Sequence, residues 1–160
     1  MSEILNTEFF KNWEEAFESH KDALRPASEF DWFAVDAKGQ VACFSTAGFG
    51  LVPKLVFRDK EMCWKVYDYF YEEPADYKQF SSNYTLMDYD TALYASRGLF
   101  FYDNPSDMWR PYELLKVPDK AVHFSELPIE IKDWLLPLTF KDLEFSASPK
   151  IDVSRYFECV

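Results

Sequence analysis

Apolar residues recur at helical spacing close to the amino terminus of the chain. At ~100° per residue they fall within about a third of the helical wheel, and charged residues take the opposite side. Asn6 or Thr7 is a suitable residue for the start of this helix, and Pro26 ends it soon after Leu24. We predict an amphipathic helix that packs on a sheet, with His20 as a core histidine that has one hydrogen-bonded nitrogen. Its buried stripe is predicted to be Phe9, Phe10, Trp13, Ala16, Phe17, His20 and Leu24.

The stretch 30–53 predicts a β-hairpin followed by a loop. Residues alternate between two faces along both arms, yet each face carries bulky apolar groups. We therefore expect the hairpin to be covered on both sides and to lie centrally in its sheet. The connection from Asp36 to Gly39 supplies a turn-starting carboxylate and a residue that tolerates positive φ. In the loop, Gly48 and Gly50 are expected to allow a bend out of the sheet.

The rest of the chain predicts a mixture of helices and strands. A second helix is predicted to begin after Asp59 and to end near Glu73, with a buried stripe of Met62, Cys63, Val66, Tyr67 and Phe70. Further elements are expected as strands at 99–102, 112–117 and 121–124, helices at 90–97 and 128–136, and a hairpin formed by 140–147 and 151–157. The chain is thus predicted to be a single α+β domain over residues 1–160. Its mostly antiparallel central sheet would carry the N-terminal amphipathic helix and the second long helix.

Composition and charge favour a cytoplasmic protein that binds other proteins. Apolar residues make up 48% of the 160 residues, and neither a signal peptide nor a membrane span is apparent. The three cysteines are an odd number without close spacing, so we expect free thiols, with Cys43 and Cys63 buried. The net charge of −11 disfavours direct contact with nucleic acid or an anionic membrane. It suits a basic macromolecular partner, although solubility alone would also explain it.

The sequence contains no motif typical of catalysis or of metal binding. A nucleophilic triad needs a histidine near Ser, Thr or Cys, and the two histidines, His20 and His123, both fall in regular, partly apolar segments. The cysteines and histidines lack the spacing of a zinc site, and the acids lack the pattern of a calcium loop. We therefore expect no enzyme activity, no catalytic residues, no metal and no cofactor.

Tyrosines and acids alternate between Tyr67 and Tyr102. Most of the ten tyrosines lie there, against only Lys78 and Arg97 as basic residues. Rigid amphipathic rings beside carboxylates are suited to a cationic surface. Trp64 and Tyr71 fall on the flank of the second helix, where two interpretations stay open. They either cover neighbouring segments or serve as anchors at the border of a binding surface.

Several motifs resemble those of a known group of proteins. The hairpin carries DWFAVD, then GQVA, then FSTAGFG continuing to Pro53, and GLFFYD, YELL with Pro118, and Leu127-Pro128 follow downstream. In this order the motifs resemble small bacterial immunity proteins. These are the cytosolic partners of polymorphic and contact-dependent growth-inhibition toxins.

The resemblance implies that the chain binds and neutralises a cognate toxin C-terminal domain. A toxin that cuts nucleic acid is basic around its active site, and an acidic inhibitor matches it electrostatically. We expect the toxin-facing surface to combine two aromatic anchors with a group of acids: Trp64, Tyr71, Asp68, Glu72, Glu73, Asp76, Asp88 and Asp90.

Two other functions stay open from the sequence. One is a small cytosolic enzyme or ligand-binding protein with a pocket beside the Gly48–Pro53 loop. The other is a regulatory or scaffold module that binds a different basic protein. The toxin's chemistry, the oligomeric state and the stoichiometry of binding are also open.

Overall fold

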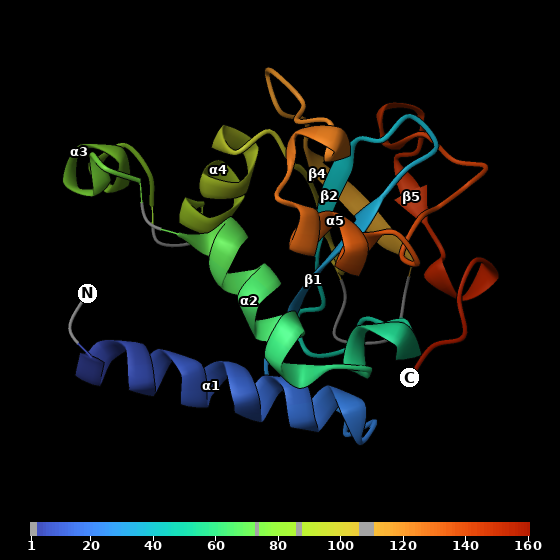
Figure 1. The fold of residues 1–160 in the computed structure, drawn as a ribbon, viewed down its shortest axis with the longest axis horizontal. Helices are drawn as coiled ribbons and strands as arrows, with labels where there is room; N and C mark the ends of the chain where they lie inside the picture. The colour runs from blue at the N-terminus through green and yellow to red at the C-terminus, as the bar shows by residue number, and fades with distance from the viewer. Residues whose placement is uncertain (1–2, 73, 86–87, 106–110) are drawn as a thin grey trace.

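The computed structural model describes residues 3–72, 74–85, 88–105 and 111–160, and five strands of these ranges form one mixed sheet (Figure 1). The strands follow chain order across the sheet, and β2 pairs with β3 in parallel while the other three pairings are antiparallel. The α+β class is therefore confirmed, with one parallel pairing in a sheet that was predicted to be mostly antiparallel. The strands are β1 Asp31–Val35, β2 Val41–Ser45, β3 Phe100–Asp103, β4 Tyr112–Lys116 and β5 Lys150–Ile151.

Helices α1 to α4 lie to one side of this sheet in Figure 1, whereas α5 lies in front of its strands. Figure 1 shows α1 along the lower side, α2 rising from it, and α3 projecting furthest from the sheet. Their bounds are α1 Glu3–Lys21, α2 Lys60–Tyr71, α3 Tyr77–Ser82, α4 Tyr89–Ser96 and α5 Ile129–Leu135. Short 3-10 turns cover Lys54–Phe57, Phe124–Glu126, Phe145–Ala147 and Val153–Arg155. None of the helices in the described ranges is long and apolar enough to cross a membrane.

The first helix forms with the predicted stripe but with different ends. It begins at Glu3, ahead of the predicted cap, and ends at Lys21, so Leu24 lies outside it with 56% of its surface exposed. Trp13 and Phe17 are buried and pack edge-on or tilted against Phe30 at the start of the sheet. The middle of the stripe is therefore buried, whereas Phe9 and Phe10 are half-buried against aromatic rings of α2.

His20 is a buried core residue, as predicted. Its Nε2 lies 2.9 Å from the Ser28 carbonyl and 3.1 Å from the Thr46 hydroxyl. Burial lowers the pKa of His20 to about 4, although the hydrogen bond to Ser28 opposes that shift. The imidazole is therefore neutral at physiological pH and ties α1 to the end of β2.

The hairpin turn is held by one buried carboxylate. Asp36 accepts hydrogen bonds from the backbone N–H groups of Lys38, Gln40 and Phe145 at 2.8 to 3.0 Å. Gly39 has φ +79°, the left-handed conformation predicted for this position. Because the third bond comes from a residue 109 positions away, the same side chain shapes the turn and anchors the C-terminal segment.

The hairpin lies at the edge of the sheet, which corrects the prediction of a central position. Both of its strands are buried on both faces, but β1 has only β2 as a strand neighbour. Its open edge is closed by the segment after α5, since Val35 donates to Leu138 and accepts from Phe140. A non-strand segment can satisfy edge groups as a strand does, so apolar faces alone did not reveal the edge.

The two glycines of the following loop permit close approach to the protein's own groups. Gly48 has φ +84°, and a Cβ there would collide with the backbone carbonyl of Ala27. A Cβ at Gly50 would collide with the hydroxyl of Tyr112, which also donates to the Leu51 carbonyl at 2.9 Å. The predicted bend therefore serves packing between the loop and the sheet.

Aromatic rings form the core on one face of the sheet. Trp32, Phe44 and Tyr102 occupy neighbouring register positions on β1, β2 and β3 and stack with centroid distances of 4.4 and 4.9 Å. Cross-strand aromatic pairs of this kind each stabilise a sheet by about 0.2–1 kcal/mol. On the opposite face, Phe33 packs on Phe70 of α2, which attaches the helices to the sheet.

The C-terminal hairpin predicted from 140–147 and 151–157 is wrong. Two 3-10 turns replace it, and the two-residue β5 pairs with β4 instead. The Tyr102 hydroxyl lies within hydrogen-bonding distance of the Phe145 and Ser148 carbonyls, so side chains satisfy backbone groups that a hairpin would pair. The short strand predicted at 121–124 is reduced to one bridge between Gln40 and His123.

Candidate functional site

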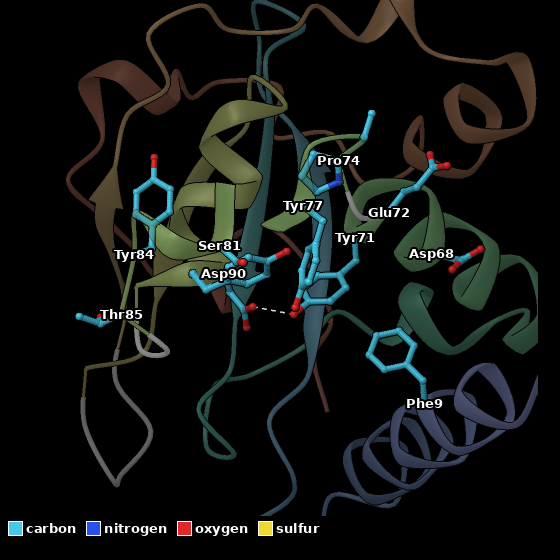
Figure 2. A pocket seen from close by; sticks show the side chains of 12 residues that line it. Phe9, Asp68, Tyr71, Glu72, Pro74, Tyr77, Ser81, Tyr84, Thr85 and Asp90 are labelled. Atoms are coloured by element: carbon cyan, nitrogen blue, oxygen red, sulfur yellow. Dashed lines mark hydrogen bonds between the residues drawn. The ribbon is translucent and has the colours of Figure 1, made fainter. Parts of the chain in front are cut away.

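A hollow of about 820 Å³ lies where four helices meet beside the sheet (Figure 2). The residues that line it come from α1, from the end of α2, from α3 with its flanking loops, and from α4. Its aromatic walls are Phe9, Tyr71, Tyr77, Tyr84 and Tyr89, and its carboxylates are Asp68, Glu72 and Asp90. No Lys or Arg is among the described residues that line it.

Helical spacing explains why α2 contributes so much of the wall. Tyr71 and Glu72 follow Asp68 by three and four residues, at the end of the helix and directly after it, so both lie on the same side as Asp68. The helix ends at Tyr71, and the chain then turns through Pro74 into the six-residue α3. The first turn of α4 returns the chain to the same place with Asp90.

Tyr71 is fixed in the hollow by both its ring and its hydroxyl. The ring stacks on Tyr67 and Phe9 with centroid distances of 5.4 and 5.6 Å. The hydroxyl donates to Asp90 Oδ1 at 2.6 Å, the bond drawn in Figure 2. Burial raises the pKa of Tyr71, and the hydrogen bond to Asp90 adds to that shift, so the group stays a neutral donor.

Trp64 lies outside this hollow and belongs to the contact between α1 and α2. Its ring meets Phe10 at 5.0 Å and Trp13 at 5.3 Å, in both cases edge to face or steeply inclined. It is half-buried there. Of the two interpretations of the α2 aromatics, packing accounts for Trp64, whereas Tyr71 both packs and lines the hollow.

The other acids of the predicted surface are distributed around the hollow. Asp68, Glu72 and Asp90 line it, whereas Asp76 and Asp88 are exposed residues that precede α3 and α4. Asp88 accepts a hydrogen bond from Thr85 at 2.7 Å. Glu73, the remaining predicted residue, lies outside the described ranges.

The carboxylates of the hollow have no cationic partner within the described part of the chain. Its ion pairs between Lys or Arg and acids all involve acids elsewhere. Burial and, second, the like charge of Glu72 raise the pKa of Asp68. Arg97 donates to the backbone carbonyl of Glu72, not to its carboxylate. These carboxylates are therefore unpaired by Lys or Arg within the described ranges.

A smaller cavity of about 160 Å³ shares Phe9 and Asp90 with the hollow and reaches Asp31, the first residue of β1, and Glu29, which precedes it. Asp31 accepts a hydrogen bond from Tyr94 at 2.7 Å. Burial and, second, the negative charge of Glu29 raise the pKa of Asp31 to about 7. Acid therefore extends from the surface towards the sheet.

Four of the five rings of the hollow lie in the tyrosine- and acid-rich region that the sequence marks, but the sequence did not identify Phe9 or the acids behind the hollow. Phe9 was assigned to the buried stripe of α1, and Asp31 to a strand. One signal could have identified Asp31, because an acid at the start of a strand with two apolar faces calls for a partner. Tyr77 and Tyr84 are marked only by the density of tyrosines and acids, because α3 has no buried residues and hence no apolar period.

The remaining reactive side chains have structural roles. His123 Nδ1 accepts from the Ser125 backbone N–H and caps a 3-10 turn. Burial raises the pKa of Cys43 and Cys63, and that of Cys159 to about 11, so none is a thiolate at neutral pH. Within the described ranges, no three His, Cys, Asp or Glu residues are grouped to hold a metal ion.

No family model, curated protein or solved structure matches this chain. The likeness to immunity proteins thus stays a prediction that rests on the sequence motifs.

Proposed function

We propose that this protein binds and neutralises a basic bacterial toxin domain, as immunity proteins do. The observation that carries the proposal is the hollow between α1, α2, α3 and α4, which joins tyrosine rings to carboxylates without a lining Lys or Arg. A net charge of −11 extends the negative field beyond that surface. Such a field increases the association rate and the specificity for a basic partner.

The proposal places the toxin on the face formed by the end of α2, α3 and the start of α4. Asp68, Glu72 and Asp76 supply charge there, and the partly exposed tyrosines supply contact area at low entropic cost. Trp64 lies outside this face and helps to hold α2 against α1 through its contacts with Phe10 and Trp13. An interface of this composition resembles the tyrosine-rich centres of protein–protein contacts.

The direct test is to look for a toxin domain encoded immediately upstream of the gene and to capture it with this protein. We expect co-purification and rescue of growth when the two proteins are expressed together. Reversing Asp68, Glu72 and Asp76 to lysine should weaken binding at least tenfold at low salt and flatten its salt dependence. Reversing three exposed acids elsewhere, Glu15, Asp119 and Asp142, changes net charge equally and is the matched control.

The proposal is wrong if the chain neither retains that toxin nor restores growth. It places the face wrongly if both triple variants weaken binding to the same extent. Circular dichroism on each variant separates a loss of binding from a loss of fold.

A second candidate is a protein that binds a small organic cation. The volume of the hollow favours it, because small-molecule sites span about 300–1,000 Å³ and this one is about 820 Å³. The site would then be the hollow, since the Gly48–Pro53 loop, suggested by the sequence, packs against Ala27 and Tyr112. Calorimetry with tetramethylammonium distinguishes the two, because the toxin-binding proposal expects no micromolar affinity for it.

A further inference from the structure

We infer that the hollow receives one arginine side chain of the basic protein partner, between its tyrosine rings and the Asp90 carboxylate. This inference rests on the proposed function and specifies how one point of the interface is recognised. Figure 2 shows the bonded pair Tyr71 and Asp90 between Phe9 and Asp68 on one side and Tyr84 on the other. A side chain that enters there meets rings on two sides and a carboxylate at the same place.

Asp90 has the geometry of a receptor for a forked donor. Its Oδ1 accepts the Tyr71 hydroxyl at 2.6 Å, which fixes the orientation of the carboxylate. No ion pair engages this carboxylate within the described ranges. A guanidinium offers two parallel N–H groups to a carboxylate, and such charge-assisted bonds are roughly twice as strong as neutral ones.

The rings favour arginine over lysine. Tyr77 and Tyr84 line the hollow and keep 41% and 42% of their surface exposed. Their rings are therefore accessible to a side chain that enters it. The planar guanidinium is weakly hydrated and stacks on such rings, whereas the compact ammonium of lysine holds its water more strongly. Arginine is also enriched among the residues that dominate interface energies.

Charge supports a cation as the occupant. Asp68, Glu72 and Asp90 surround the opening, and Asp31 and Glu29 lie behind it in the adjoining cavity. A cation that enters this field relieves the repulsion among these carboxylates. Burial is the main cause of the raised pKa of Asp68, and the like charge of Glu72 adds to it. An apolar or anionic side chain would leave that repulsion in place.

Hexa-arginine and hexa-lysine peptides test the inference without the toxin. Their charge is equal, so nonspecific attraction to an acidic surface is the same for both. We expect hexa-arginine to bind at least fivefold more tightly at 50 mM salt. The Tyr77→Leu and Asp90→Asn variants should abolish that preference. The controls are Tyr69→Leu, an equally exposed tyrosine of α2 outside the hollow (39%), and Asp119→Asn.

The possible outcomes distinguish a failure of the arginine site from a failure of the proposed function on which it rests. Equal affinity for the two peptides, or a preference that Tyr77→Leu leaves intact, overturns the arginine site while toxin capture can still succeed. Binding of methylguanidinium or tetramethylammonium as tightly as hexa-arginine, without toxin capture, overturns it in favour of a free organic cation. Arginine preference lost only in the hollow variants, together with toxin affinity reduced at least tenfold in Asp90→Asn, supports it.

Discussion

Polar side chains have different bonding partners in the hairpin and in the face formed by the end of α2, α3 and the start of α4, called here the α2–α4 face. In the hairpin, Asp36 accepts three backbone N–H groups, and the Thr46 hydroxyl accepts those of Phe30 and Gly48. In the α2–α4 face, the carboxylates of Asp68 and Glu72 have no cationic partner within the described ranges. The contrast separates polar groups that hold the fold together from carboxylates that form no ion pair in the described ranges and that we propose bind a partner.

The largest effect on stability is expected at Asp36. The Asp36→Ala variant leaves three backbone donors without their charged acceptor, in a residue that is 1% exposed. Hydrogen bonds to charged groups contribute about 1.5–3 kcal/mol each and do not add fully, so unfolding free energy should fall by about 4 kcal/mol. Urea denaturation measures it, with Asp119→Ala as the exposed control. A loss of unfolding free energy below about 1 kcal/mol would contradict the structural role proposed for Asp36.

A smaller effect should appear as a dependence of stability on pH. The pKa of His20 falls from 6.5 in the unfolded chain to about 4 in the fold, so the unfolded state binds more protons between these values. Stability therefore decreases as pH falls from 6.5 to 4, by about 1.4 kcal/mol per unit, and His20→Gln should remove about 3 kcal/mol of that loss.

Asp31 acts in the opposite direction over nearly the same range. Its pKa rises from 3.8 to about 7 in the fold, so the folded state binds more protons and gains stability as pH falls from 7 to 4. Asp31→Asn should therefore steepen the loss of stability on acidification, whereas His20→Gln reduces it. Denaturation curves at pH 4, 5, 6 and 7 check both signs, and parallel slopes for the two variants would contradict them.

Tyr71→Phe should have a modest effect, because it removes one hydroxyl and keeps the ring stack. Asp90 then loses its 2.6 Å donor, and the unfolding free energy should fall by about 1–2 kcal/mol. Tyr69→Phe is the matched control on the same helix, with an expected change below about 0.5 kcal/mol. Equal effects in urea denaturation would show that the Tyr71–Asp90 bond does not stabilise the fold.

The smallest effect on folding is expected within the α2–α4 face at Asp68. Asp68→Asn removes a charge that is disfavoured by burial and by Glu72, so stability should stay within about 0.5 kcal/mol or rise slightly. Toxin affinity should nevertheless fall. A loss of stability above about 1 kcal/mol would assign Asp68 to the fold and weaken the contrast between the two regions.

Local spacing predicted the elements whose partners lie close in the chain. The cap of α2 at Asp59 accepts from Met62 at 3.1 Å, and α4 ends before Gly98, which has φ +84°. Both follow from residues within one turn of the helix end. The six-residue α3 was missed because it has no buried residue and hence no apolar period.

The sequence by itself determined the hairpin turn, the stripe of α1 and the acidity of the tyrosine-rich region, because each depends on neighbouring residues or on composition. Only the tertiary structure placed β1 at a covered edge, since the covering segment follows α5. It alone brought Phe9 of α1 beside Asp90 of α4. Side chains so far apart in the chain meet through helix packing, which no local pattern records.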